Sequence, residues 1–371
     1  MKIETFALER NQSLYENSVR YNLTESGVHP RALKDVLTPD EIEEMISLPL
    51  GYGFTNGAPA LRKAVAQHYP GLDESNVLIT NGSAEANFAV MWSLIEPRDD
   101  VVLMLPNYMQ ISGLLRAFGA NVKPFHLRED LNWAPDVEAI RAATTPNTKM
   151  IVVCNPNNPT GAVLDRTTME AIATIARECG AYIVSDEIYR GSELDGIECP
   201  SFADVYEKAI VCSGLSKAMA LPGLRIGWIA APTDVVTNAW HRHDYTTICA
   251  ASTSQYVATK VLQPERRLKI LSHGRDLLNG NLTAFTDWLS KSNCRFRFIP
   301  PRAGGMAFVG YDLDINSSAL VDKLRMERSV FVVAGDWFGM DRYLRFGIGT
   351  STATLVEGLK GVTETLRAVA R

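Results

Sequence analysis

The chain has 371 residues, enough for two or three domains at roughly 150 residues each. Hydrophobic residues make up 46% and charged residues 21%, which excludes a disordered chain, and no apolar run reaches the roughly 18 residues of a membrane span. A net charge of -5 gives no reason to expect nucleic-acid or membrane partners. The six cysteines lack metal or redox spacing and the first residues lack a secretory apolar core, so we expect a cytoplasmic enzyme.

Short apolar runs separated by helical stretches fill the chain from about residue 50 to 260. They are apolar throughout rather than alternating, as expected for strands covered on both faces. The runs are 77–80, 101–105, 150–154, 182–185, 209–212 and 226–230. Residues 167–179 have helical spacing and stop at Gly180, and two runs contain Cys154 and Cys212, which we expect to be buried thiols. We predict an α/β domain over residues 46–265, with helices on both faces of a mostly parallel sheet.

The pattern changes after residue 265. A long helix is predicted over 265–291, followed by strands at 294–299 and 306–309 and a helix from about 317. Strands at 330–333 and 343–348 and a helix to residue 371 complete a smaller α+β domain over 266–371. Residues 1–45 match neither pattern and could pack on either domain; we expect them to form a segment that packs with the smaller one.

Lys217 stands just after the run 209–212, in the string Ser213-Gly214-Leu215-Ser216-Lys217. The simple interpretation is an exposed ammonium at a strand end. The alternative is an amine whose pKa is lowered by desolvation and by cationic neighbours, which makes it a Schiff-base nucleophile. Small neighbours that allow close backbone approach, and Arg225 eight residues later as a forked phosphate ligand, favour the second interpretation.

Three further polar groups follow predicted strands. Asp186 ends the run 182–185 with Tyr189 three residues on; it could be a helix N-cap, or a carboxylate that holds a proton on a pyridine-type nitrogen. Residues 155–161 read as an Asn- and Pro-rich turn that could present an amide to the strand ends. Ser83, with Ala84 next in the chain, could be a plain N-cap or part of an anion site at a helix start. In a parallel sheet these positions meet at one edge, where ligands collect.

Residues 214–227 resemble the lysine signature of the class I/II pyridoxal-phosphate aminotransferases, a fold-type-I family. Residues 155–161, Asp186 to Tyr189, and Tyr52 with Gly57 are similar to its other signatures, in the same order and at fitting spacing. The resemblance covers nearly the whole chain. It implies pyridoxal 5'-phosphate as cofactor, and an amino acid and a 2-oxo acid as substrates.

The resemblance also implies a role for each matching residue. Lys217 would form the aldimine and move the substrate proton, and Asp186 would pair with the ring nitrogen. The remaining roles are as follows: Asn158 and Tyr189 on the ring hydroxyl oxygen; Ser83, Ala84, Ser216 and Arg225 on the phosphate; Tyr108 stacked on the ring; Gly27 by its backbone and Arg345 by its guanidinium on the substrate. Tyr52 would reach the phosphate in a neighbouring subunit, which implies a homodimer with shared active sites.

Some positions depart from the family pattern. Gly214 stands where the family often has a serine or threonine, and whether Ser213 replaces that hydroxyl stays open. The string Ser26-Gly27-Val28-His29 is similar to that of capreomycidine synthase and related enzymes, which use this fold for chemistry other than simple transamination. We expect a solvated His29 rather than an active-site base. We likewise expect residues 241–245 to form a helix face or end, with side-chain recognition by Arg242 as the alternative.

The sequence thus predicts an aminotransferase that moves an amino group from an L-amino acid to a 2-oxo acid through Lys217. A lyase, cyclase or oxidase with the same cofactor site is the first alternative, since fold and cofactor binding do not decide the fate of the substrate carbanion. A cofactor-sensing regulator is disfavoured because no helix-turn-helix or basic segment precedes residue 50. Neither Glu25 nor any further arginine identifies the substrate side chain.

Overall fold

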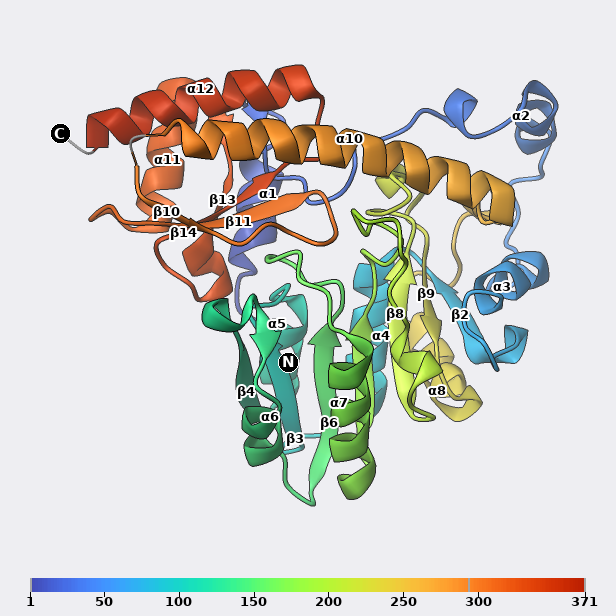
Figure 1. Ribbon diagram of the computed structural model, residues 1–371. Helices are drawn as coiled ribbons and strands as arrows, with labels where there is room; N and C mark the ends of the chain where they lie inside the picture. Colours follow the sequence, from blue (N-terminus) through green and yellow to red (C-terminus); the bar gives the residue numbers. More distant parts are fainter. Residues whose placement is uncertain (1, 293, 370–371) are drawn as a thin grey trace.

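The computed structural model describes residues 2–292 and 294–369, which form a large sheet domain and a smaller sheet domain that lies above it in Figure 1. The helices are α1 (Ala7–Tyr15), α2 (Pro39–Ile46), α3 (Pro59–Ala66), α4 (Ser83–Leu94), α5 (Gln110–Phe118), α6 (Val137–Ala143), α7 (Arg166–Cys179), α8 (Thr233–His243), α9 (Ser252–Val261), α10 (Pro264–Ser290), α11 (Ser317–Arg328) and α12 (Thr352–Val369). The strands are β1 (Tyr21–Asn22), β2 (Val77–Thr80), β3 (Asp100–Leu105), β4 (Asn121–Arg128), β5 (Ala134–Pro135), β6 (Thr148–Cys154), β7 (Tyr182–Asp186), β8 (Ala209–Gly214), β9 (Gly227–Ala230), β10 (Phe296–Phe298), β11 (Met306–Tyr311), β12 (Val330–Phe331), β13 (Val333–Ala334) and β14 (Tyr343–Gly347).

The large sheet has eight strands in the order β2-β9-β8-β7-β6-β3-β4-β5. From β8 to β4 the neighbours pair in parallel, whereas β9 is antiparallel to both β2 and β8. The prediction of a mostly parallel sheet is confirmed. Because β9 reverses direction between β2 and β8, these two strands point the same way. The carboxyl ends of β2, β6, β7 and β8 therefore share one edge of the sheet with the start of β9.

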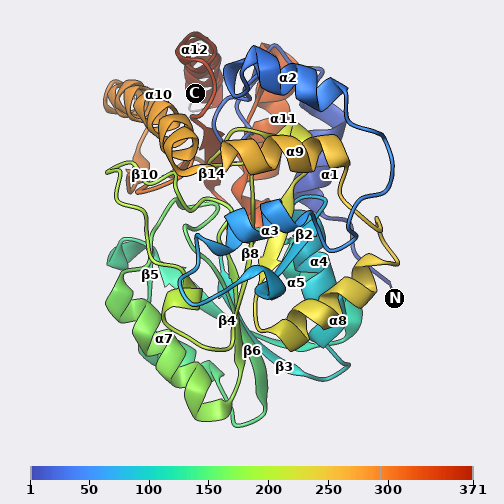
Figure 2. The ribbon, with the colours of Figure 1, turned by 90° about the vertical axis from the view of Figure 1, so that its right-hand side faces the viewer.

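Helices cover both faces of this sheet. In Figure 2, α7 lies on one side and α4, α5 and α8 lie on the other. Met169, Ile172 and Ala176 of α7 pack against buried side chains of β3 and β6, and the apolar side chains of α4, α5 and α8 form a separate core on the opposite face. The end of α7 at Gly180, in the left-handed region at φ 71°, is as the sequence predicts.

All six strands that the sequence predicts for the large sheet are present. Their side chains are buried on both faces of the sheet, and the thiols of Cys154 and Cys212 are buried as predicted. Strand β4 gave no such signal. Only Phe125 and Leu127 of its eight residues are buried, so it has no continuous apolar run. The sequence of a half-exposed strand near the edge of a sheet resembles that of a loop, so the strand was not predicted.

The smaller domain has a four-stranded antiparallel sheet in the order β10-β11-β14-β13, which packs against α10, α11 and α12. The prediction of one strand over 330–333 is wrong. That stretch divides at Val332: β12 pairs in parallel with β1, and β13 pairs with β14. The end of the predicted last helix, at residues 370–371, lies outside the described residues.

Residues 23–29 run in extended form between the two domains. The amide of Gly347 donates to the carbonyl of Leu23 at 2.7 Å, and the amide of Gly305 donates to the carbonyl of Ser26 at 2.9 Å. The amide of His29 donates to the carbonyl of Gly349 at 2.7 Å. These bonds fix the segment against the smaller domain, directly above the carboxyl edge of the large sheet. Across the described residues, no helix has both the length and the apolar character that crossing a membrane would require.

Candidate active site

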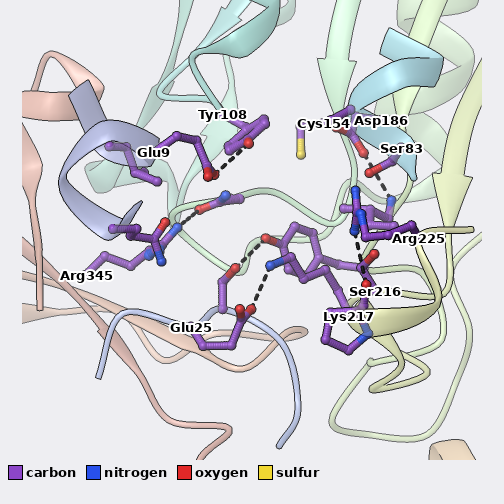
Figure 3. Close-up of a pocket in the computed structure, with 18 residues that line it drawn as sticks. Glu9, Glu25, Ser83, Tyr108, Cys154, Asp186, Ser216, Lys217, Arg225 and Arg345 are labelled. Carbon is purple, nitrogen blue, oxygen red and sulfur yellow. Dashed lines mark hydrogen bonds and ion pairs between the residues drawn. The ribbon is translucent and has the colours of Figure 1, made fainter. Parts of the chain in front are cut away.

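A cavity of about 320 Å³ lies between the carboxyl edge of the large sheet, the smaller domain and the N-terminal segment (Figure 3). Most of the residues that the sequence singles out lie in its lining: Ser83, Ala84, Tyr108, Asn158, Asp186, Tyr189, Ser216, Lys217, Arg225 and Arg345. Gly27 and Tyr52 lie outside that lining. Groups that are far apart in the sequence thus face one another across a single cavity.

Asp186 is the last residue of β7, opposite Cys154 of β6 and Cys212 of β8. Its carboxylate accepts hydrogen bonds from the side-chain amide of Asn87 at 3.1 Å and from the backbone of Ile188 at 3.2 Å. It is 3% exposed, and burial raises its pKa. Its alternative interpretation as a helix N-cap is wrong, because β7 leads into a turn rather than a helix. A cation that reached this carboxylate would stabilise its charged form.

Lys217 follows β8 and points into the cavity. Its amine lies 2.6 Å from Oε1 of Glu25, which comes from the extended N-terminal segment (Figure 3). Burial alone would lower the pKa of this amine, but the Glu25 carboxylate, together with the Tyr189 hydroxyl, raises it above its ordinary value. The interpretation of Lys217 as an exposed surface ammonium is therefore wrong. The expectation of a lowered pKa is wrong as well, because the closest charged partner of the amine is the Glu25 carboxylate rather than a cation.

The start of α4 presents groups that are suited to binding an anion. Gly82 is the N-cap at φ 83° and makes no side-chain cap, so Ser83 is the first helical residue and its reading as a plain N-cap is wrong. A Cβ atom at Gly82 would lie 2.2 Å from the Arg225 guanidinium, so only glycine lets that guanidinium pack on the helix start. With Ser216 beside them, these groups combine N–H donors, hydroxyls and one positive charge.

The structure explains why Gly214 departs from the family pattern. A Cβ atom at Gly214 would lie 2.6 Å from the carbonyl oxygen of Ile226 on the neighbouring chain segment. The hydroxyl of Ser213 donates to the carbonyl of Glu187 at 3.0 Å and is buried outside the cavity. Ser213 therefore does not replace the missing hydroxyl.

Arg345 lies in the middle of the smaller sheet, on β14 between β11 and β13. Its guanidinium donates to the side-chain oxygen of Asn158 at 2.8 Å and to the carbonyl of Thr24 at 2.6 Å. It is 2% exposed, and among the described residues its Nε has no hydrogen-bond partner. A buried cation with an unused donor at the cavity wall fits a carboxylate ligand.

Two tyrosines complete the walls of the cavity, and the hydroxyl of each contacts a side chain from the first 29 residues of the chain. The hydroxyl of Tyr189 lies 2.7 Å from that of Ser26, and burial raises the pKa of Tyr189 to about 12. Tyr108 donates to the carboxylate of Glu9 at 2.7 Å, and burial raises its pKa as well. Both phenols therefore stay protonated at neutral pH and can act as hydrogen-bond donors.

Several lining residues were missed by sequence reasoning. Leu8, Glu9 and Gln12 of α1 line the cavity, as do Ser26, Cys154, Ile188 and Pro222. Glu25 was noted in the sequence but not linked to Lys217. A helix with no motif gives no local sign that it will pack over an active site. Only the position of Asn87, four residues after Ser83 on the same helix, could have been predicted to face the strand ends.

The other candidates from the sequence lie away from the cavity. His29 is exposed, as expected, and residues 241–245 end helix α8. The half-buried Arg242 donates to Asn238 on its own helix at 3.4 Å and is not part of the lining of this cavity. Tyr52 is 86% exposed.

Residues 24–362 match the family model for aminotransferase class I and II, and this span includes every residue of the predicted site. The chain belongs to this family. It is similar to a PLP-dependent aminotransferase from Streptococcus suis 89-1591 at 35% identity and a TM-score of 0.94, over 100% of both chains.

Curated relatives cover the same length. A capreomycidine synthase from Streptomyces vinaceus is 28% identical over 94% of this chain and 90% of its own length. An aspartate aminotransferase from Pyrococcus horikoshii is 29% identical over 90% of this chain and 88% of its own length. The chain is thus a pyridoxal-phosphate-dependent aminotransferase, an enzyme that moves an amino group from an amino acid to a 2-oxo acid.

The residues present fit this cofactor. Its phosphate matches the N–H groups and guanidinium at the start of α4, and its aldehyde matches a lysine amine within the same cavity. The carboxylate of Asp186 has only neutral donors, from Asn87 and Ile188, as direct partners among the described residues. A protonated ring nitrogen would supply the positive partner that burial of this carboxylate requires.

Proposed function

We propose that Lys217, Asp186 and Arg345 carry the chemistry of this aminotransferase, and that its donor is an L-amino acid. The observation that carries the proposal is the meeting of an amine, a buried carboxylate, an anion site and a buried guanidinium in one cavity. These four groups complement an aldehyde, a ring nitrogen, a phosphate and a substrate carboxylate.

When bound, pyridoxal phosphate supplies an electron-accepting ring that stabilises negative charge at the substrate α-carbon. Asp186 would keep a proton on the ring nitrogen, and Asn158 and Tyr189 would donate hydrogen bonds to the ring hydroxyl oxygen. Ser83, Ala84, Ser216 and Arg225 would hold the phosphate, and Tyr108 would contact the ring. These are the roles proposed for the cofactor side of the cavity.

On the substrate side, Arg345 binds the α-carboxylate and the backbone of Gly27 contacts the substrate. This fixes the α-carbon near Lys217, whose amine accepts the α-proton and returns it in the reverse direction. Before that amine bonds to the cofactor, the carboxylate of Glu25 holds it in place at 2.6 Å. The smaller domain and the N-terminal segment cover the cavity and reduce the access of water.

We also propose a homodimer with shared active sites. Tyr52 is 86% exposed and lies in a stretch with two other exposed apolar side chains, Leu50 at 89% and Phe54 at 62%. Exposed apolar side chains this close together are typical of a surface that another chain covers. Tyr52 would then reach the phosphate bound by the second subunit.

All six cysteines are free thiols, which supports a cytoplasmic location. They are Cys154, Cys179, Cys199, Cys212, Cys249 and Cys294.

A single-turnover experiment tests the function. The holoenzyme is mixed with a panel of L-amino acids without a 2-oxo acid, and the bound cofactor and the released product are analysed. Transamination predicts one equivalent of the amine form of the cofactor and one of 2-oxo acid. Release of ammonia or a cyclic product, with the cofactor recovered as aldehyde, would contradict it.

The second candidate function is a lyase or cyclase with the same cofactor site. One observation favours it: a relative that matches over 94% of this chain is named a synthase rather than an aminotransferase. The same experiment separates the two, because only transamination leaves the nitrogen on the cofactor.

A further inference from the structure

The position of Glu25 is fixed by hydrogen bonds of its own side chain and of the residues on either side. The residues on either side are both bonded to site residues: the Thr24 carbonyl accepts from Arg345 at 2.6 Å, and the Ser26 hydroxyl lies 2.7 Å from that of Tyr189. The side chain folds back so that Oε1 also accepts the amide of Gly27 at 2.8 Å. The carboxylate therefore has one fixed position at the cavity wall.

In this position Glu25 binds a cation. Burial would raise its pKa, but the ammonium of Lys217 more than offsets this, and the guanidinium of Arg345 adds to the effect, so the pKa is about 2. Its side chain is 42% exposed, and Figure 3 shows it between Arg345 and Lys217. While the Lys217 nitrogen is bonded to the cofactor, as it would be when an amino donor first binds, the Glu25 carboxylate would lack this ammonium and would face the substrate.

The charges around the cavity leave Glu25 without another partner from this chain. Among the described residues, the lining holds three cations, Lys217, Arg225 and Arg345. When an amino donor first binds, all three would be occupied, by the aldehyde, the phosphate and the α-carboxylate. Two lining carboxylates besides Asp186 remain, and a third, Glu16, lies close enough that Glu25 and Glu9, after burial, raise its pKa.

The second lining carboxylate, Glu9, accepts from Tyr108 and so has a neutral partner. A substrate side chain that carries a negative charge would meet repulsion here, since like charges in a partly buried site are unfavourable. A positively charged side chain would replace the ammonium that Glu25 has lost.

We propose that Glu25 is a specificity residue that binds the cationic side chain of the amino donor, so that the preferred substrates are basic L-amino acids. This rests on the proposed function, because it requires Lys217 to carry the cofactor and Arg345 to hold the α-carboxylate. The ligand is an alkylammonium or guanidinium group attached through a flexible chain to the α-carbon.

The test compares pairs of donors with side chains of similar shape, of which one member is positively charged and the other is neutral. The rate of conversion of the cofactor to its amine form is measured for L-lysine against L-norleucine and for L-arginine against L-citrulline. Wild type should prefer the charged member by about 10- to 100-fold in kcat/KM, the range expected for a charge-assisted hydrogen bond. Glu25→Gln should remove most of that preference, whatever it does to the absolute rates through Lys217.

A binding measurement complements the rates. In the cofactor-loaded Lys217→Ala variant, titration of the cofactor absorbance gives Kd values for the same pairs of amino acids. The Kd for the charged member should be lower, and adding Glu25→Gln should raise it towards that of the neutral member. Glu16→Gln is the matched control: it removes a nearby carboxylate outside the cavity lining and should change the preference by less than about fivefold.

Two results would overturn the role of Glu25. One is an equal loss for charged and neutral donors in Glu25→Gln, which would mean that the carboxylate acts only on Lys217 or on the α-ammonium. The other is a wild-type preference for L-aspartate or L-glutamate. Failure of every donor to convert the cofactor would instead refute the proposed function itself.

Discussion

The cofactor-facing and substrate-facing walls of the cavity are built in different ways. The first is made by strand ends of one sheet: β2, β6, β7 and β8 each deliver a polar group within a few residues of their last residue. The second joins distant segments, since Arg345 donates to the Thr24 carbonyl, 321 residues away in the chain, and to Asn158, 187 residues away. The wall made by local motifs carries the shared chemistry, whereas the wall made by distant contacts is free to define the substrate.

The largest expected effect lies on the cofactor-facing wall. Lys217→Ala should lower kcat by more than about 10⁴-fold, because it removes both the bond to the cofactor and the group that moves the proton. Stopped-flow measurement of the half-reaction with any active donor checks this. Retained transamination at a tenth of the wild-type rate would show that another residue performs the step.

Asp186→Asn should have the next largest effect. It removes the charge that a protonated ring nitrogen requires in a buried site, and breaking such a pair costs about 3–5 kcal/mol, or roughly 10²- to 5 × 10³-fold in kcat/KM. The side chain keeps its size, so the fold should persist in circular dichroism. Equal losses for all donors are expected, and a change in donor preference would contradict the separation of the two walls.

Arg345→Lys tests the substrate-facing wall. A lysine cannot form the planar fork that a guanidinium makes with a carboxylate, so KM for amino donors should rise by about 10- to 100-fold. The affinity for pyridoxal phosphate, measured by absorbance titration, should stay within a few fold of wild type. A large loss of affinity for pyridoxal phosphate would show that Arg345 contributes to cofactor binding, which would contradict its assignment to the substrate-facing wall.

The smallest effect on activity is expected for Glu85, a residue in the first turn of α4 whose hydrogen bonds stabilise the start of that helix. Its carboxylate accepts from Thr246, from Thr247 at 2.7 Å and from the amide of Asn81 at 2.6 Å, and it lies 3.2 Å from Nδ1 of His243. Burial would raise its pKa, but the adjacent His243 ring and the hydrogen bonds from Thr246, Asn81 and Thr247 lower it to about 2.

Because the folded-state pKa of Glu85 lies below its ordinary value of 4.5, its stabilising contribution is present above pH 4.5 and is lost as pH falls towards 2. Urea unfolding of wild type and Glu85→Gln over this range should show about 1–3 kcal/mol more pH-dependent loss in wild type. Identical pH dependence would show that the network contributes nothing to folding. Donor preference should not change in either case.

The strands of the large sheet could be predicted because burial on both faces requires apolar runs, and the residues after them could be predicted to meet because parallel strands end at one edge. Strand β4 and the division at Val332 could not, since one lacks a continuous apolar run and the other depends on pairing with β1. Long-range pairing of this kind leaves no local pattern.

The same distinction applies to the site. The positions of Lys217, Asp186 and Ser83 followed from strand ends and family-like motifs. The contact of Glu25 with Lys217 could not be predicted, because it depends on how residues 23–29 pack between the domains. The residues that set specificity were therefore the hardest to read from the sequence.

The most direct measurement concerns the bond between the protein and its cofactor. The enzyme is loaded with pyridoxal phosphate, treated with borohydride to fix any lysine–cofactor bond, digested and mapped by mass spectrometry. The structure predicts a single modified lysine, at position 217, and no such modification in Lys217→Ala. A stoichiometric label on any other lysine, with Lys217 unmodified, would contradict the account.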